Sequence, residues 1–346
     1  MEEWIHRLRA GEPLNREQWA MLIGNADGDP LLFQQAVQVR QAVYGRDIYI
    51  RGLIELTNYC KNDCRYCGIR RSNRQAQRYR LSQDQVLACC ETGYALGFRT
   101  FVLQGGEDPA ATDGFLCGLI REIKAAWPDC AVTLSMGERS RASYQALREA
   151  GADRYLLRHE TACPQHYQQL HPADLQLENR IRCLEDLADL GYQTGSGFMV
   201  GSPGQTVDCL AQDMLLLTRL RPQMVGIGPF LPHHDTPFAH YPPGRLDLTL
   251  RMVALTRLLL PQALIPATTA LATLDPQGRE LGILAGANVV MPNLSPPDVR
   301  EKYLLYDNKA HSGPESAEAV ADLKASMERI GYHVVTDRGD WKPPQS

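Results

Sequence analysis

Short apolar runs alternate with amphipathic helical patterns along most of the chain, and this alternation restricts the possible folds more than any other feature. Eight runs are rich in β-branched and apolar residues, and turn or polar residues follow most of them. The expected strands are 48–56, 100–104, 131–135, 154–157, 193–200, 224–229, 263–268 and 287–291. The expected helices between them are 82–96, 113–126, 141–150, 177–190, 206–220, 248–259 and 276–285. Strands that alternate with helices pair in parallel, so the pattern predicts an α/β fold, a (βα)8 TIM barrel.

The rest of the chain flanks this barrel. Residues 1–46 are mostly helical in pattern, and a last helix is expected near 315–330. No linker of low complexity divides the sequence. We therefore predict one domain, with a helical N-terminal extension at 1–46, the barrel at 47–310 and a C-terminal helical extension at 311–346.

Composition limits the partners. The chain has 346 residues, with 36 Lys and Arg against 40 Asp and Glu, for a net charge of −4. No Lys/Arg-rich run stands out, so we expect small-molecule partners, no nucleic acid and no membrane. The first residues lack an apolar signal region, and the apolar 255–274 stretch is interrupted by Arg257, Pro261 and Pro266. Ten cysteines fit a reducing compartment, and we expect a cytoplasmic protein.

The barrel interpretation predicts where the chemistry lies, because active sites in this fold form at the C-terminal ends of the strands. Unusual residues follow successive strands at that end. They include a cysteine loop after the first strand, Gln104-Gly-Gly-Glu-Asp108 after the second, Ser135-Met-Gly-Glu138 after the third, Arg158-His-Glu-Thr161 after the fourth and a glycine-rich run at 195–205 after the fifth. Any one of these could be a turn or a structural ion pair, but their recurrence favours a shared site.

Cys60, Cys64 and Cys67 have the spacing C-x3-C-x2-C. Three thiolates can hold three corners of an iron–sulfur cube and leave the fourth iron open to a ligand. A zinc site is the simpler alternative, but it needs four ligands and usually a second cysteine or histidine pair, which this chain lacks. His233-His234-Asp235 also contains metal-binding residue types, although adjacent side chains are expected to point in different directions. His159 is expected to fill the barrel wall.

The cysteine spacing, with the aromatic Tyr66 before the third cysteine, resembles that of radical S-adenosylmethionine (SAM) enzymes. The runs 102–109, 151–161, 224–233 and 265–270 are similar to those of the HydE family, the radical SAM maturases of iron-only hydrogenase. The resemblance spans about 48–306. It implies a radical SAM barrel, one 4Fe–4S cluster that cleaves SAM to a 5′-deoxyadenosyl radical, and a role in assembling the diiron subsite of the hydrogenase H-cluster.

The resemblance also implies roles for individual residues. It implies that the three cysteines hold the cluster, that Glu160 binds the ribose of SAM and that Arg180 binds the carboxylate of SAM. The full set of implied SAM contacts is Tyr66, Gln104, Gly105, Gly106, Glu107, Ser135, Glu160, Arg180 and Met199. The implied inner cavity for substrate, treated as the catalytic set, is Arg154, Arg158, Thr268, Thr269, Tyr303 and Tyr306.

The implied substrate is an organometallic complex, a cysteine-bound iron carbonyl cyanide unit, and the implied partners are other hydrogenase maturases and a ferredoxin or flavodoxin as electron donor. Some family members hold an accessory cluster, but no cysteine follows Cys209 here, so we expect one cluster. Two alternatives stay open. One is a biotin synthase-like or methylornithine synthase-like activity, and the other is a non-catalytic Fe–S or SAM-binding scaffold or sensor.

Overall fold

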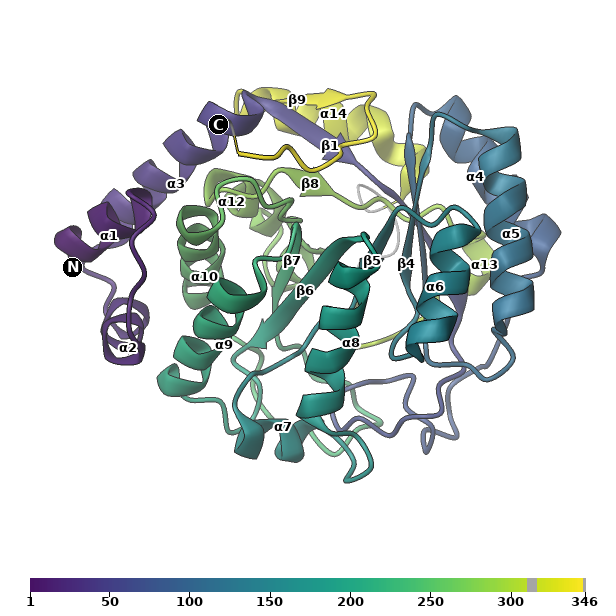
Figure 1. The fold of residues 1–346 in the computed structure, drawn as a ribbon, viewed down its shortest axis with the longest axis horizontal. Helices are drawn as coiled ribbons and strands as arrows, with labels where there is room; N and C mark the ends of the chain where they lie inside the picture. The colour runs from purple at the N-terminus through teal and green to yellow at the C-terminus, as the bar shows by residue number, and fades with distance from the viewer. Residues whose placement is uncertain (310–315, 345–346) are drawn as a thin grey trace.

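Parallel strands close into a barrel with helices on its outside (Figure 1). The computed structural model describes residues 1–309 and 316–344. The strands are β1 Asp47–Ile50, β2 Gly52–Thr57, β3 Thr100–Gly105, β4 Ala131–Ser135, β5 Arg154–Leu156, β6 Gln193–Val200, β7 Met224–Pro229, β8 Val289–Val290 and β9 His333–Val335. Strands β2 to β7 form one parallel sheet in chain order, and β8, β1 and β9 form a second. The predicted α/β barrel is confirmed.

Two of the expected strands differ in detail. The first is divided at Arg51, where the chain changes partners: β1 pairs with β8 and β9, and β2 pairs with β3. The seventh, 263–268, makes only isolated bridges, from Leu264 to Met224 and from Pro266 to Val289. Proline cannot donate a ladder hydrogen bond, which limits pairing there. These bridges still connect β7 to β8 and close the ring.

The helices are α1 Glu2–Arg9, α2 Arg16–Gly24, α3 Asp29–Tyr44, α4 Gln83–Ala95, α5 Asp113–Ala126, α6 Arg141–Glu149, α7 Pro164–Leu170, α8 Leu177–Asp189, α9 Val207–Leu220, α10 Leu246–Leu259, α11 Thr269–Leu274, α12 Gly278–Leu284, α13 Pro297–Arg300 and α14 Val320–Arg329. Side chains of Ser82, Thr112 and Thr206 accept a backbone N–H at the starts of α4, α5 and α9. These caps explain why the three helices begin within one residue of their expected first residues. Helices α7, α11 and α13 lie outside the expected set.

The N-terminal helices lie against one side of the barrel, where α2 packs on α9 and α3 packs on α10 (Figure 1). Among the described residues, none of the helices combines the length and the apolar character that crossing a membrane requires. The boundary expected between residues 310 and 311 lies outside the described residues, and the division into a barrel and two extensions stays a prediction.

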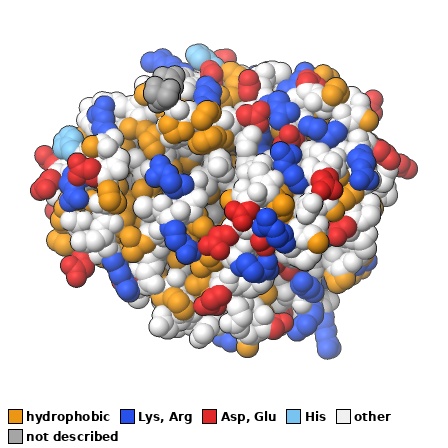
Figure 2. Space-filling model, in the orientation of Figure 1, with side chains coloured by type: hydrophobic (Ala, Val, Ile, Leu, Met, Phe, Trp, Pro, Cys, Tyr) orange, Lys and Arg blue, Asp and Glu red, His pale blue; other side chains and the backbone are white. Residues whose placement is uncertain are grey.

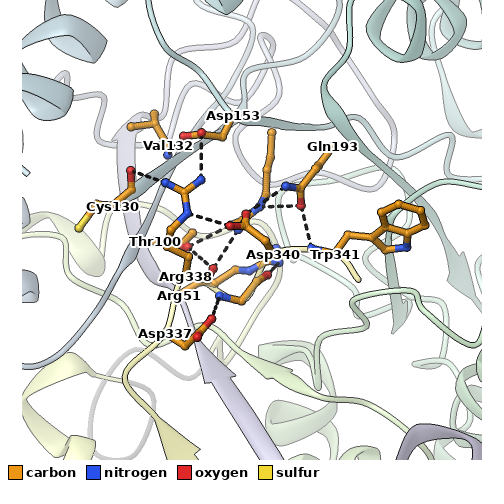
Figure 3. Close-up of polar contacts among 12 residues, drawn as sticks. Arg51, Thr100, Cys130, Val132, Asp153, Gln193, Asp337, Arg338, Asp340 and Trp341 are labelled. Carbon is orange, nitrogen blue, oxygen red and sulfur yellow. Dashed lines mark hydrogen bonds and ion pairs between the residues drawn. The ribbon is translucent and has the colours of Figure 1, made fainter. Parts of the chain in front are cut away.

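The C-terminal segment covers the end of the barrel where the strands begin. Strand β9 pairs in parallel with β1, and the chain then crosses the starts of β3 to β6. Figure 3 shows the polar contacts of this segment, in which Arg338 donates to Asp153 and Asp340 accepts from Arg338 and Gln193. This end of the barrel is therefore filled by protein, and the loops that follow the strands lie at the other end.

Candidate functional site

A cavity of about 340 Å³ opens at the C-terminal ends of the strands. Its size is that of a small-molecule site. Every predicted site residue except Arg154 and Met199 lines it. These residues are Cys60, Cys64, Tyr66, Cys67, Gln104, Gly105, Gly106, Glu107, Ser135, Arg158, Glu160, Arg180, Thr268, Thr269, Tyr303 and Tyr306. The structure therefore brings together side chains that lie far apart in the sequence.

The cysteine loop follows β2 and is held by buried polar side chains. Asn58 donates to the carbonyls of Gln77 and Lys302 at 2.8 and 2.7 Å, and its side-chain oxygen accepts the Tyr79 N–H at 2.8 Å. The Arg78 guanidinium donates to several loop carbonyls, among them that of Ile69 at 2.8 Å. These bonds satisfy the backbone of a loop that has no regular secondary structure, so that it can present side chains in a fixed arrangement.

The three thiols fit a metal cluster. Burial raises the pKa of Cys60 and Cys64, and burial together with the charge of Cys60 raises the pKa of Cys67 to about 12. The thiols thus disfavour one another's ionised forms, and a cationic iron centre would remove this penalty by holding them as thiolates. Cys60, Cys64 and Cys67 would hold the cluster.

A glycine turn after β3 lies directly against the cysteine loop. A side chain at Gly106 would come within 2.2 Å of the Tyr59 carbonyl oxygen, so only glycine allows this approach. The Lys61 N–H donates to the Glu107 carbonyl at 2.9 Å, and the Lys61 ammonium pairs with the Glu107 carboxylate at 3.2 Å. The Glu107 carboxylate also accepts the Glu138 N–H at 3.0 Å. The cysteine loop and the turn therefore form one rigid wall.

Glu160 has a left-handed backbone conformation, with φ at +64°. A residue other than glycine or asparagine rarely adopts it, and it persists where neighbouring bonds impose it. Strand β6 imposes it here, because the Glu160 N–H donates to the Gly197 carbonyl at 3.0 Å and its own carbonyl accepts the Met199 N–H at 3.2 Å. The Glu160 carboxylate faces Arg158 across 3.0 Å. Strain at a cavity residue indicates a positioned functional group.

Arg180 reaches the cavity from α8. Its Nε pairs with the Glu138 carboxylate at 2.5 Å, and its Nη1 donates to the Arg158 carbonyl at 2.6 Å. Part of its hydrogen-bonding capacity is therefore used within the protein. The family resemblance implied that Arg180 binds SAM, and sequence reasoning did not find its pairing with Glu138.

Tyr66 is oriented by His171. The Tyr66 hydroxyl lies 3.3 Å from His171 Nε2, and His171 Nδ1 lies 3.0 Å from the Tyr167 carbonyl oxygen. The carbonyl can only accept, so Nδ1 carries the proton and Nε2 accepts from Tyr66. Burial and the charge of Arg180 lower the pKa of His171 to about 3, which keeps it neutral. Met199 is outside the cavity lining and packs in an apolar cluster that contacts Tyr66.

The inner part of the cavity contains polar atoms with unused hydrogen-bonding capacity. Thr268 Oγ1 and Arg158 Nε are buried and have no hydrogen-bond partner among the described residues. Buried polar groups are normally satisfied, so these two atoms indicate a polar guest. Gln104 Nε2 lies 3.4 Å from the Tyr303 hydroxyl, so the end of β3 contacts the inner part of the cavity.

Glu55 and Lys309 form a buried ion pair that sequence reasoning missed. Both line the cavity, Glu55 is fully buried, and Asn293 donates to its second carboxylate oxygen at 2.9 Å. Glu55 is on β2, before the cysteine loop, and Lys309 lies between β8 and β9. Their pairing depends on the closed barrel, although a charged residue inside an apolar strand is a signal that could have drawn attention to Glu55.

Arg154 does not line the cavity, which corrects the prediction that it binds substrate. Its side chain is fully buried and donates to Thr100 Oγ1 and the Arg338 carbonyl at 2.9 Å each and to Asp340 at 2.5 Å. Arg154 begins β5, whereas Arg158 follows that strand, and four extended residues span roughly 13 Å. Arg154 therefore lies at the closed end of the barrel, where residues serve stability.

His233 and His234 stack with ring centroids 4.5 Å apart, contrary to the expectation that they diverge. Together with Asp307 they bring three possible ligand atoms within 4.8 Å. However, His233 Nδ1 accepts the Asp235 N–H at 3.0 Å, so in the neutral ring the proton is on Nε2. That nitrogen has no lone pair for a metal, and the geometry disfavours a metal site here.

A barrel with a three-cysteine loop at its open end defines a radical SAM protein, and residues 54–217 match the model of the Radical SAM superfamily. Over 323 residues the chain is 47% identical to the FeFe hydrogenase maturase subunit HydE of Thermotoga maritima, which covers 93% of this chain and 92% of that protein. The chain therefore belongs to the HydE family. Radical SAM proteins use a 4Fe–4S cluster and SAM, the cofactors that the cysteine spacing and resemblance predicted.

More distant relatives agree on the fold. The chain is 26% identical to the 3-methylornithine synthase of Methanosarcina barkeri, over 88% of this chain and 84% of that protein. The crystal structure of methylornithine synthase PylB superposes with a TM-score of 0.83 at 24% identity, over 96% of this chain and 97% of that one. The X-ray structure of the FeFe-hydrogenase maturase HydG from Carboxydothermus hydrogenoformans superposes with a TM-score of 0.80 at 21% identity, over 96% of this chain and 78% of that one. At these identities the structures support the fold alone.

Proposed function

We propose that this protein is a radical SAM maturase that acts in assembly of the diiron subsite of the iron-only hydrogenase H-cluster. The observation that carries the proposal is the single cavity that joins the cysteine loop to inner polar groups, in a chain 47% identical to a HydE. When bound, the 4Fe–4S cluster supplies one electron that cleaves SAM to methionine and a 5′-deoxyadenosyl radical.

In this proposal the chain's own residues bind and orient the reactants. Cys60, Cys64 and Cys67 hold the cluster. Glu160 accepts hydrogen bonds from the ribose hydroxyls, and its imposed backbone keeps the carboxylate in place before SAM arrives. Arg180 has Nε on Glu138 and Nη1 on the Arg158 carbonyl, and it offers Nη2 to the SAM carboxylate. The remaining proposed SAM contacts are Tyr66, the 104–107 turn, Ser135 and, through its packing on Tyr66, Met199.

The inner cavity receives the substrate. We propose a cysteine-bound iron carbonyl cyanide complex, an anionic guest made by a partner maturase. Arg158 and Thr268 have unused buried donors that suit such a guest. Thr269, Tyr303 and Tyr306 complete the wall. The electron donor is proposed to be a ferredoxin or flavodoxin. The ten cysteines are all free, which suits the proposed cytoplasmic setting.

The SAM assignment is tested with Glu160→Gln, which keeps the side-chain shape and removes the charge. Loss of a charge-assisted hydrogen bond to the ligand should weaken SAM binding by about tenfold, with little change in Tm. Equilibrium binding of SAM to the reconstituted protein measures the effect, and Glu149→Gln on the exposed face of α6 is the matched control. A large fall in Tm without any change in SAM affinity would show that Glu160 is structural.

The substrate assignment is tested by adding the iron complex to the anaerobic, reduced protein and following 5′-deoxyadenosine and related products. Their rate or identity should change when the complex is present. Arg158→Leu should abolish this response and preserve slow uncoupled SAM cleavage. If the wild type ignores the complex but converts dethiobiotin or lysine, the maturase assignment fails. If reduced protein with its cluster forms no 5′-deoxyadenosine at all, the scaffold or sensor alternative is favoured.

A further inference from the structure

The segment that carries the three cysteines is strongly basic. Residues 58–80 contain seven Lys or Arg residues and one acidic residue, Asp63, for a formal charge of +6 in a chain whose total is −4. Polar residues separate most of these basic residues, which is why no single Lys/Arg run stands out in the sequence. The rest of the chain is acidic, so this loop creates a local positive potential on one part of the surface.

Three of the basic side chains are used to build the loop. Arg70 pairs with Asp63 at 2.7 Å, and Arg78 donates to loop carbonyls. Arg80 pairs with Asp108 at 2.6 Å and lies over the ring of Tyr59. The charges of Arg70 and Arg80 are balanced by aspartates, and Arg78 bonds to backbone carbonyls. These three residues therefore serve to hold the loop in its fold.

Four other basic side chains point to solvent. Arg65, Arg71 and Arg74 are exposed, and none has an acidic partner within residues 1–309 and 316–344. Lys61 is 55% exposed and pairs with Glu107. Because these three arginines form no ion pair with a described acidic residue, their charge is available to attract other molecules. We call Lys61, Arg65, Arg71 and Arg74 the basic rim.

The basic rim lies beside the cluster ligands. Lys61 directly follows Cys60, and Arg65 directly follows Cys64. All three ligand cysteines are partly accessible, in contrast to the seven other cysteines, which are buried. In Figure 1 the loop after β2 lies at the lower right. Figure 2 has the same orientation and shows Lys and Arg side chains in that area. A partner that docks on this face would approach the cysteine site directly.

We propose that the basic rim is the docking surface for an acidic one-electron donor protein. The inference rests on the proposed function, in which an electron must reach the site held by Cys60, Cys64 and Cys67. The donor would lose one electron to the cluster that these cysteines would hold, and no bond is made or broken in that transfer. Electron-transfer complexes bury little surface and rely on charge for their encounter, and the basic rim supplies that charge. An anionic membrane or a nucleic acid would also be attracted, but neither delivers an electron.

The test uses the reconstituted protein with its cluster and a reduced, acidic flavodoxin as the donor. Stopped-flow absorbance measures the rate of cluster reduction, and equilibrium binding measures the affinity for the oxidised donor, at low and high salt. The double variant Arg71→Glu/Arg74→Glu should lower both the rate and the affinity by about tenfold or more at low salt. It should also flatten the salt dependence, since fewer charges attract the donor.

Two controls isolate the docking step. Arg121→Glu/Arg329→Glu makes the same change in net charge on α5 and α14, away from the loop, and should behave as wild type. Dithionite, a small reductant that needs no docking, should reduce the double variant normally. The inference is overturned if the rim variant keeps the donor rate and affinity, or if it loses binding to a DNA duplex while binding the donor normally. Failure of dithionite to drive SAM cleavage in the wild type would instead overturn the proposed function.

Discussion

Replacing Asp340 with asparagine tests whether Arg154 is a structural residue at the closed end of the barrel. The Arg154 side chain is fully buried, and Asp340, 40% exposed, is its charged partner. Breaking a fully buried ion pair costs about 3–5 kcal/mol, whereas an exposed pair contributes about 0–1 kcal/mol. Because Asp340 is partly solvated and Arg154 keeps its bonds to Thr100 and the Arg338 carbonyl, we expect about 2 kcal/mol.

This cost predicts a small but measurable fall in Tm. An unfolding entropy of about 2.1 cal/mol/K per residue gives roughly 0.7 kcal/mol/K for a chain of this length, so about 2 kcal/mol lowers Tm by about 3 °C. Calorimetry of the anaerobic protein measures the shift, and SAM cleavage should be unchanged. The double variant Arg154→Met/Asp340→Asn should be less destabilised than the sum of the single variants, because it removes the buried guanidinium together with its partner. If Arg154→Met keeps the wild-type Tm but abolishes the response to substrate, Arg154 acts in the cavity and the structural reasoning is wrong.

Three further predictions concern the cluster, the buried pair in the cavity and acid stability. The reconstituted protein should contain about four irons per chain by metal analysis, and Cys64→Ala should hold far fewer, whereas a value near eight or bound zinc would contradict the single-cluster assignment. Lys309→Met leaves Glu55 buried without its cationic partner and should lower stability by about 3 kcal/mol, measured by denaturation, with Lys324→Met on α14 as the exposed control. The hydrogen bond from Arg300 lowers the pKa of Glu318 to about 2, below its ordinary value near 4.5. Its contribution to stability is therefore complete above pH 4.5 and is lost as the pH falls toward 2, so the Tm difference between wild type and Glu318→Gln should shrink on acidification.

Local patterns in the sequence predicted much of the fold. Helices with a clear N-cap, such as α4 after Ser82, begin within a residue or two of their expected positions. His159 fills the barrel wall as expected, bonded to Ser196 and Asp213. Short helices such as α7 and the three-residue β9 were missed, because they contain too few residues for a periodic pattern and form only through tertiary contacts.

The candidate site was predictable to the extent that its residues follow successive strands. That rule placed Glu107, Ser135 and Glu160 at one cavity. It could not reveal pairings across the closed barrel, such as Glu55 with Lys309, since these depend on segments more than 250 residues apart. The error at Arg154 has the same origin, because its partner Asp340 lies near the end of the chain.

The C-terminal segment also affects how the chain can fold during synthesis. Strand β1 receives β9 as a neighbour, and the buried Arg154 receives Asp340, only after residues 333–340 have been made. Until then, one edge of β1 in the nascent barrel is unpaired and the Arg154 guanidinium has no counter-charge from Asp340. Synthesis of residues 333–340 then supplies both partners. A ribosome-bound chain that stops before residue 333 should expose the start of the barrel to proteases, and release of the full chain should protect it.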